Sequence, residues 1–243
     1  MPIEDKNAFL REVVHTIPGW LEDYTALRTM DLLEWQEQNG VRGPLLEIGI
    51  FAGRYFSLLL RSASRTGDAI VGLDTFEWID EPAVRTHLAK VDANHQARLV
   101  TGYSTGKSAA DLLELLGGNP RFVSVDGSHE RNDVFWDLRL VEAILASNGI
   151  VALDDFLNPL TLGVNEAAHL FFSQPRNLAP IAYIANKLFL CRPSAANRMR
   201  GVLEEMIVAD QIEPRSQGFR ERATHGRHHI EQKLWGHSLL VVP

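Results

Sequence analysis

Short, nearly continuous apolar runs alternate along the chain with longer stretches in which apolar residues recur every three or four positions. The short runs are rich in Val, Ile and Leu, which is typical of strands buried on both faces of a parallel sheet. We expect strands of this kind at residues 44–50, 69–74, 97–101, 121–126 and 149–154.

The stretches between these runs have the spacing of helices with one apolar face. Residues 134–145 place Val, Leu, Val and Leu at i, i+4, i+7 and i+11, and residues 109–116 form a second stripe that ends at Gly117-Gly118. Strands that alternate with helices build right-handed βαβ units. The pattern therefore predicts an α/β fold with a doubly wound, mostly parallel, Rossmann-like sheet and helices on both faces.

Two segments lie outside this alternation. Residues 6–38 carry helical stripes broken by Pro18-Gly19, which indicates an N-terminal helical cap or lid. After the fifth strand we expect a helix at 160–172, a hairpin over 180–191 that turns at Asn186, a helix at 195–210, a polar His-rich loop at 213–233 and a final strand, a candidate edge, in LLVVP. We therefore divide the chain into an N-terminal helical cap (1–40), a cofactor-binding Rossmann-like core (41–191) and a C-terminal extension of the same domain (192–243).

Composition narrows the classes of protein that fit. A length of 243 residues with 45% hydrophobic and 23% charged residues suits one globular domain with additions. Lys plus Arg number 24 against 31 for Asp plus Glu, and a net charge of −7 gives no overall field that favours nucleic acid or an anionic membrane. The single cysteine, Cys191, excludes an internal disulfide framework and a cysteine-rich zinc site.

The start of the chain, MPIEDKNAF, lacks the basic and then apolar order of a signal peptide. No run approaches the roughly 18 apolar residues of a membrane span. We expect a cytoplasmic protein with a small-molecule partner and without nucleic-acid or membrane partners, and a homo-oligomer stays open.

Ligands of open α/β sheets bind beyond the carboxyl ends of the strands, so the residues that follow each run are the candidates for ligand contacts. The first run leads into Glu47-Ile48-Gly49-Ile50-Phe51-Ala52-Gly53. Gly49 and Gly53 permit a tight turn and a close approach to a ligand. Their G-x-x-x-G spacing differs from the G-x-G-x-x-G of dinucleotide sites, and a plain strand-to-helix turn explains it equally well.

Polar residues after the second and third strands outline a nucleoside site. Asp74 ends the second strand, where a carboxylate can accept hydrogen bonds from two ribose hydroxyls or can cap a turn. The third strand is followed by the hydroxyl-rich residues 101–105. Ser104 can meet an adenine edge there or cap the next helix.

The most specific signal is acidic. Asp126 closes the fourth strand and Asp154-Asp155 closes the fifth, 28 residues further on. Neighbouring strands lie ~4.8 Å apart, and like charges held that closely raise each other's pKa unless a cation neutralises them. Oxygen ligands without a thiolate favour Mg²⁺, or Mn²⁺ in its place. Alternatively each Asp caps its own loop and no metal binds.

Histidines supply two further candidates. His129 follows Asp126 by three residues, and an imidazole is suited to removing a proton from a substrate hydroxyl at neutral pH. A solvated loop histidine and a fourth metal ligand are the competing interpretations. The set His225, His228, His229 and His237 lies in a polar, Arg-rich stretch and is expected to be solvated.

Together these residues resemble the class I S-adenosylmethionine-dependent methyltransferases, and within them the metal-dependent small-molecule O-methyltransferases of macrolide-sugar and catechol type. The resemblance covers roughly residues 41–191 and includes Asp126-Gly127-Ser128-His129 followed by Asp154-Asp155. Many methyltransferases have a glycine where Phe51 stands. The resemblance implies His129 as general base, Asp126, Asp154 and Asp155 as metal ligands, and Glu47, Gly49, Phe51, Gly53, Asp74, Ser104 and Asp126 as cofactor-binding residues.

The resulting hypothesis is an S-adenosylmethionine-dependent, Mg²⁺- or Mn²⁺-dependent O-methyltransferase. Its acceptor would be a hydroxyl of a small polyhydroxylated molecule, such as a sugar or natural product. Three alternatives stay open: a metal-independent methyltransferase with His129 as base, a nucleotide- or NAD-linked α/β enzyme, and a non-catalytic cofactor-binding protein. Segments 1–40 and 192–243, which would choose the acceptor, match no pattern that identifies it.

Overall fold

The structure is a computed structural model that describes residues 3–94 and 97–243, so the first two residues of the expected N-terminal cap lie outside it. The helices are α1 (Lys6–Glu12), α2 (Asp23–Gln38), α3 (Phe56–Thr66), α4 (Glu81–Leu88), α5 (Ala109–Leu116), α6 (Arg131–Ile144), α7 (Leu162–Phe171), α8 (Ala196–Ala209) and α9 (Pro214–Thr224). The strands are β1 (Leu45–Ile48), β2 (Ile70–Asp74), β3 (Arg98–Thr101), β4 (Phe122–Val125), β5 (Ile150–Leu153), β6 (Ala179–Ile184), β7 (Lys187–Cys191), β8 (Glu231–Leu234) and β9 (His237–Val242).

The strands of the described residues form one nine-stranded sheet in the order β3-β2-β1-β4-β5-β7-β6-β9-β8. The five strands expected from the apolar runs are β1 to β5, and they pair in parallel. Strand β7 runs antiparallel between β5 and β6, which makes the sheet mixed but mostly parallel at its centre. The predicted doubly wound α/β fold is confirmed.

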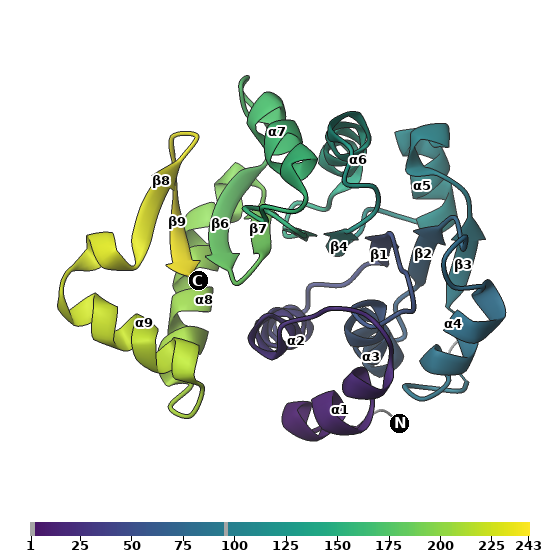
Figure 1. The fold of residues 1–243 in the computed structure, drawn as a ribbon, viewed down its shortest axis with the longest axis horizontal. Helices are drawn as coiled ribbons and strands as arrows, with labels where there is room; N and C mark the ends of the chain where they lie inside the picture. Colours follow the sequence, from purple (N-terminus) through teal and green to yellow (C-terminus); the bar gives the residue numbers. More distant parts are fainter. Residues whose placement is uncertain (1–2, 95–96) are drawn as a thin grey trace.

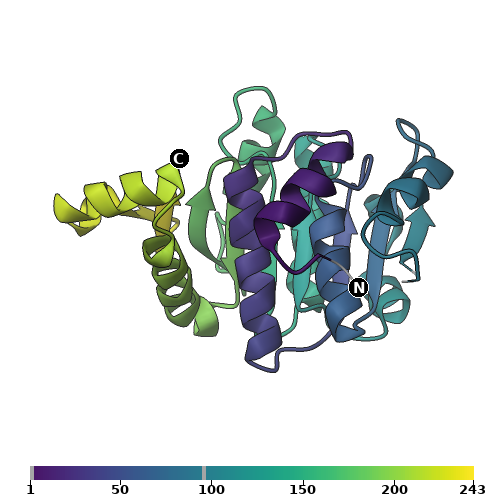
Figure 2. The same cartoon turned by 90° about the horizontal axis from the view of Figure 1, so that it is seen from below.

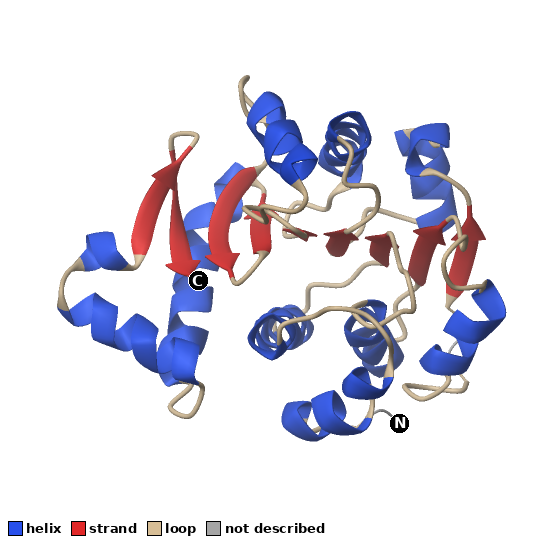
Figure 3. Ribbon diagram, in the orientation of Figure 1, coloured by secondary structure: helices blue, strands red, loops and turns tan. Residues whose placement is uncertain are grey.

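Helices cover both faces of this sheet (Figure 1, Figure 3). Buried residues of α5, α6 and α7 form one core cluster, and those of α1, α2, α3, α4 and α8 form another on the opposite face. Figure 2 shows α2 running beside α3 across that face, with α1 in front of them. The expected N-terminal cap is therefore part of the helical layer. Helix α2 packs its apolar side chains toward the sheet, which removes them from water.

The C-terminal part agrees with the sequence in four elements, of which the first is the helix expected at 160–172, observed as α7, and it differs in two respects. The expected hairpin is β6–β7, the expected helix is α8, and the final run is β9. The prediction of a loop over 213–233 is wrong, because this stretch contains α9 and β8. Helix α9 buries only Ser216 and Phe219, so its sequence lacks the apolar stripe that would reveal a helix.

The final strand is also not at the edge. Strand β9 lies between β6 and β8, and the short strand β8 forms the edge, with Lys233 exposed on it. A charged residue on a four-residue strand is typical of a protected sheet edge. Within the described residues, no helix is long and apolar enough to cross a membrane.

Cys191 ends β7 inside the sheet, paired in register with Ile150 on one side and Ala179 on the other. It is a free, buried cysteine, and burial raises the pKa of its thiol to about 12. The side chain therefore behaves as a small apolar core residue.

Candidate active site

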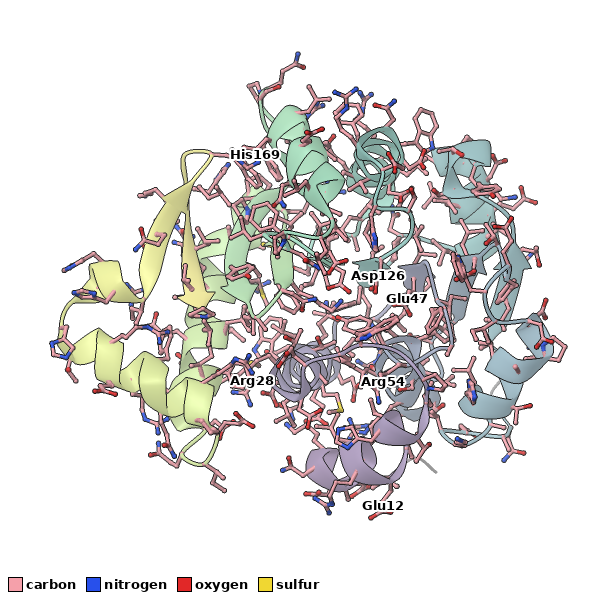
Figure 4. All side chains as sticks on the ribbon, in the orientation of Figure 1. Glu12, Arg28, Glu47, Arg54, Asp126 and His169 are labelled. Carbon is pink, nitrogen blue, oxygen red and sulfur yellow. The ribbon has the colours of Figure 1, made fainter. Side chains whose placement is uncertain are left out.

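The carboxyl ends of β1, β4 and β5 bring three carboxyl groups together. Strand β4 pairs with β5 so that Val125 faces Leu153, and Asp126 and Asp154 directly follow that pair. Asp126 donates a hydrogen bond to Asp154. Glu47, 1% exposed on β1, lies close enough to Asp126 to raise its pKa (Figure 4).

A lysine completes this group. Antiparallel pairing of β7 with β5 sets Leu188 opposite Leu153, which brings Lys187 beside Asp154. The Lys187 Nζ lies 2.7 Å from Asp154 Oδ2, its side chain is 2% exposed, and it stands 4.4 Å from the centre of the Tyr55 ring. Sequence reasoning missed Lys187, although a lone lysine inside the apolar run IANKLFLC signals a buried, paired charge.

Protonation makes the group electrically balanced. Burial raises the pKa of Asp154, but the Lys187 ammonium and hydrogen bonds from Asp126 and Lys187 outweigh burial, so the pKa falls below its ordinary value. Burial lowers the pKa of Lys187, but the nearby acidic side chains, Asp154 above all, raise it by more, so that it lies above its ordinary value. Burial raises the pKa of Asp126 and of Glu47 well above the ordinary value. At neutral pH the Asp154 carboxylate therefore offsets the Lys187 ammonium.

The next residue, Asp155, has a different partner. Its Oδ2 lies 3.2 Å from His129 Nε2, and its Oδ1 accepts a hydrogen bond of 2.8 Å from the Asn158 amide. The backbone of Asp155 is left-handed with φ 56°, an unusual conformation for a residue other than glycine. Asn186 donates to Asp154 at 2.9 Å and to Asp155 at 3.5 Å, which joins the two acidic neighbours.

His129 and Asp155 thus form an imidazole–carboxylate pair beyond the carboxyl ends of β4 and β5. The His129 side chain is 48% exposed, whereas the Asp155 side chain is 15% exposed. A carboxylate against one ring nitrogen fixes the orientation of an imidazole and leaves the other nitrogen to exchange a proton. The structure therefore brings the expected base beside one of the expected metal ligands.

The expected metal ligands do not fit a divalent ion as they are placed. Asp154 is paired with Lys187, and Asp155 is held by His129 and Asn158. Across residues 3–94 and 97–243, no group of three or more His, Cys, Asp or Glu side chains is arranged to hold a metal ion. An ammonium already supplies the positive charge that neighbouring carboxylates require. We therefore route no chemical step through a metal.

The loop after β1 is held by Asp74. Asp74 Oδ2 accepts hydrogen bonds from the backbone N–H groups of Ile50 at 2.6 Å and Phe51 at 2.8 Å, and Oδ1 accepts one from Phe76 at 2.8 Å. The expected ribose ligand therefore braces the loop, and its two oxygens keep lone pairs that can accept further hydrogen bonds.

Three residues of this loop have left-handed backbones: Gly49 with φ 83°, Phe51 with φ 50° and Gly53 with φ 91°. A Cβ at Gly49 would lie 1.9 Å from the carbonyl oxygen of Asp126, so the loop presses directly against the end of β4. Beneath it, Glu47 Oε2 is buried without a hydrogen-bond partner among the described residues. An orphaned buried oxygen of this kind fits a site for a donor group of a ligand.

Ser104 follows strand β3 and begins the 3₁₀ turn Ser104–Gly106. Its carbonyl accepts a hydrogen bond of 3.2 Å from Trp136 Nε1 on α6. One residue further along α6, Asp137 is buried, with 1% of the residue exposed. Burial raises the pKa of Asp137 to about 7, and the Ser104 side chain offsets burial only in part.

A surface hollow of about 460 Å³ opens beside the acidic group. It is lined by Gly19, Trp20, Leu21, Glu22, Arg54, Ala185, Asn186, Arg215 and Pro243. Asn186 connects this hollow to Asp154, and Figure 4 shows Arg54 below Asp126 and Glu47. Trp20 is 89% exposed, with its ring 5.9 Å from that of Phe51.

The His-rich stretch lies far along the chain from these residues. His228 and His229 belong to the 3₁₀ turn Arg227–His229, and their rings are 4.0 Å apart. Both are exposed. Exposed neighbouring rings of this kind need no metal to explain them.

Residues 46–156 match the family described as "Methyltransferase domain". Similar solved structures include the O-methyltransferase NovP, with 16% identity, a TM-score of 0.56 and coverage of 70% of this chain and 80% of that one. CalS11, a TDP-rhamnose 3'-O-methyltransferase of calicheamicin biosynthesis, has 20% identity, a TM-score of 0.55 and coverage of 77% and 87%.

An O-methyltransferase from Bacillus cereus in complex with SAH has 15% identity, a TM-score of 0.51 and coverage of 78% of this chain and 91% of that one. These identities establish a shared fold. No curated protein is significantly similar to this chain. The matched segment contains β1 except its first residue, β2 to β5, and every residue of the predicted cofactor and acidic sites.

Proposed function

We propose that the chain is a class I S-adenosylmethionine-dependent methyltransferase and that it methylates a hydroxyl oxygen of a small-molecule acceptor, a proposal that the match to a methyltransferase domain supports. The observation that carries this proposal is the His129–Asp155 pair, with 3.2 Å between Nε2 and Oδ2 at the carboxyl ends of β4 and β5. A base held in that place can deprotonate an acceptor hydroxyl beside the loop after β1. The methyltransferase match argues against an NAD-linked enzyme and against a non-catalytic role.

The residues around the loop after β1 fit the cofactor. S-adenosylmethionine supplies a sulfonium-bound methyl group to an attacking nucleophile. Glu47 Oε2 is buried without a partner among the described residues, which suits a cationic amine, and Asp74 fixes the backbone of Ile50 and Phe51. We propose Glu47, Gly49, Phe51, Gly53, Asp74, Ser104 and Asp126 as the residues that line the cofactor site.

The chain's own contribution to the chemistry is proton removal and alignment. The acceptor O–H transfers its proton to His129 Nδ1, because Nε2 faces Asp155. The acceptor oxygen then forms a bond to the methyl carbon while the carbon–sulfur bond breaks, which yields a methyl ether, S-adenosylhomocysteine and a protonated His129. Asp155 stabilises that imidazolium, and most of the acceleration comes from holding the oxygen and the methyl group close and in line.

The proposed activity is independent of a divalent metal. The resemblance implies Mg²⁺ or Mn²⁺ on Asp126, Asp154 and Asp155, but Lys187 pairs with the second of these and His129 with the third. The metal-independent alternative with His129 as base agrees with both contacts. We therefore expect a chelator to leave the rate unchanged.

We propose that the acceptor is a polyhydroxylated molecule, such as a sugar or a sugar-bearing natural product. The hollow beside Asn186 draws its lining from both flanking segments, residues 19–22 on one side and Arg215 on the other. An exposed Trp20 can stack on the apolar face of a sugar ring, while Arg54 and Asn186 supply polar contacts. Segments 1–40 and 192–243 would thus select the acceptor, and core 41–191 would bind the cofactor.

Calorimetry with S-adenosylhomocysteine and, separately, with NAD tests the cofactor. We expect binding of the first and none of the second. Transfer of a labelled methyl group to a panel of sugars and glycosylated compounds, with and without EDTA, then tests the reaction. Absence of S-adenosylhomocysteine binding would refute the cofactor site, and loss of methyl transfer in EDTA that added Mg²⁺ restores would refute metal independence.

A further inference from the structure

We infer that Lys187 is a built-in replacement for a divalent cation: its ammonium occupies the charge-neutralising position among Glu47, Asp126 and Asp154 and closes this site to metal ions. The role of Lys187 in catalysis rests on the proposed methyl transfer. Its test is metal binding, which does not depend on that reaction.

The geometry leaves the ammonium no alternative place. Lys187 begins β7 directly opposite the end of β5, and its Nζ lies 2.7 Å from Asp154 Oδ2. The residue is 1% exposed, and the Tyr55 ring, 4.4 Å away, covers it from the other side. A cation over a ring face is attracted to it, so both neighbours hold the ammonium in place.

A metal ion would have to displace this contact. A divalent ion needs several carboxylate oxygens at about 2.0–2.6 Å, and these would include the oxygen that Lys187 occupies. Moving the ammonium out would leave a buried charge without a partner, which is strongly unfavourable. The lysine therefore competes with a metal ion from within the chain.

Lys187 is consequently a positioning residue. It keeps Asp154 charged and in place, and Asn186 transmits that position to Asp155, with contacts of 2.9 Å to Asp154 and 3.5 Å to Asp155. Asp155 in turn faces His129 at 3.2 Å. A fixed cation thus orders the base without exchanging with solvent.

Replacing Lys187 should open the site to metals. We would titrate the full-length protein with Mn²⁺ and follow the free-ion signal by electron paramagnetic resonance. Wild type should bind no Mn²⁺ at concentrations up to about 1 mM. Lys187→Met should gain one site with a dissociation constant at least about tenfold below that 1 mM limit, because the carboxyls then lack their cation. Lys187→Arg, which keeps the charge, should gain none.

The double variant Lys187→Met with Asp154→Asn is the matched control. It removes both partners, so it should be more stable to heat than Lys187→Met alone and should bind no Mn²⁺. Rescue of the single variant's unfolding temperature by Mn²⁺, absent in the double variant, would support the inference. Tight Mn²⁺ binding by wild type that Asp154→Asn abolishes, or a folded Lys187→Met without gained binding, would overturn it.

Two results remain decisive if the single variant does not fold. A wild type without a Mn²⁺ site, together with a folded double variant, supports the inference, since the ammonium then explains the stability of the acidic group. A wild type with such a site overturns it. If the protein neither binds S-adenosylhomocysteine nor transfers methyl groups, the proposed function fails while the Mn²⁺ titration still decides this question.

Discussion

Two consecutive acidic residues, Asp154 and Asp155, have separate partners and therefore separate tasks. Asp154 is buried against Lys187, whereas Asp155 turns through a left-handed backbone toward His129. Backbone strain of this kind is found where a side chain has to be aimed away from its regular direction. The Asp154 carboxylate is thus neutralised by Lys187, whereas the Asp155 carboxylate orients His129.

Removing the imidazole should slow methyl transfer and spare cofactor binding. We expect His129→Ala to lower kcat by about 10²–10⁴-fold, because a positioned general base contributes that much. The affinity for S-adenosylhomocysteine, measured by calorimetry, should stay within about threefold. His228→Ala, on the exposed His-rich turn, is the control. An unchanged kcat in His129→Ala would assign the proton transfer to another group.

Asp137 should make the protein less stable as the pH rises. Burial raises the pKa of this carboxyl from 3.8 to about 7. Below about pH 4 it is protonated in both states; between about pH 4 and 7 only the unfolded chain releases the proton, so stability falls with rising pH and then levels off.

Asp137→Asn should remove this dependence and raise the free energy of unfolding at pH 8 by up to about 4 kcal/mol. Urea unfolding at pH 5 and pH 8 measures it. Glu205→Gln, an exposed residue on α8, removes one negative charge as the control. Equal stability of wild type and Asp137→Asn at both pH values would contradict the prediction.

At the scale of elements, the loop between β1 and α3 is shaped by contact with β4 and by Asp74. Its Gly49 packs against the Asp126 carbonyl, and its N–H groups at Ile50 and Phe51 are satisfied by Asp74 on β2. The loop therefore has one conformation before any ligand binds. A preformed loop lowers the entropic cost of binding.

A side chain at Gly49 should disrupt this packing. Gly49→Ala brings Cβ within 1.9 Å of the Asp126 oxygen and forces a left-handed alanine, so we expect a loss of at least about 3 kcal/mol in stability, measured by urea unfolding. Gly67→Ala is the control, because Gly67 is also left-handed with φ 74° but has nothing within 4 Å of its Cβ. It should cost only about 1–2 kcal/mol. Equal losses would mean that backbone strain alone matters.

The sequence predicts the elements that bury continuous apolar runs. Strands β1, β2, β4 and β5 were identifiable because nearly all their residues are buried, and the β6–β7 hairpin because Asn186 interrupts an apolar stretch. Strand β3 was expected to be buried on both faces, but it lies at the edge of the sheet and none of its residues is fully buried. Helix α9 was not, since a helix that buries two side chains leaves no periodic signal. The proximity of the carboxyls at the ends of β4 and β5 could be predicted because the two strands are neighbours. The position of Lys187 beside Asp154 could not, because it depends on the antiparallel register of β7 with β5, which local sequence patterns do not encode.

At the scale of the whole molecule, the C-terminal extension is joined to the N-terminal helices through buried polar contacts. The Tyr24 hydroxyl hydrogen-bonds to Ser216 at 2.8 Å. Arg28 reaches Asp210 at 2.8 Å and Asp31 at 3.0 Å. Elements from both ends of the chain thus cover neighbouring parts of one sheet, and we expect them to unfold together.

Breaking one of these contacts should destabilise the entire protein. Arg28→Met leaves Asp210 without its buried cation, whereas Asp31 keeps its ion pair with Lys6; the change should cost about 3 kcal/mol, which lowers Tm by about 6–12 °C in a protein of this size. Circular dichroism and tryptophan fluorescence should report one coincident transition. Arg11→Met, at an exposed position of α1, is the control. Two separate transitions would mean that the extension unfolds independently.

The rate at which the cysteine in β7 reacts with a thiol reagent reports how often the sheet opens around it. Cys191 is 0% exposed, and its thiol has a pKa of about 12, so a thiol-reactive dye cannot label it while β5, β6 and β7 stay paired. Labelling at neutral pH should proceed only as fast as these strands separate. Under the proposed function S-adenosylhomocysteine binds at the carboxyl ends of the neighbouring strands and should slow this labelling, so that ligand binding can be followed without any engineered probe.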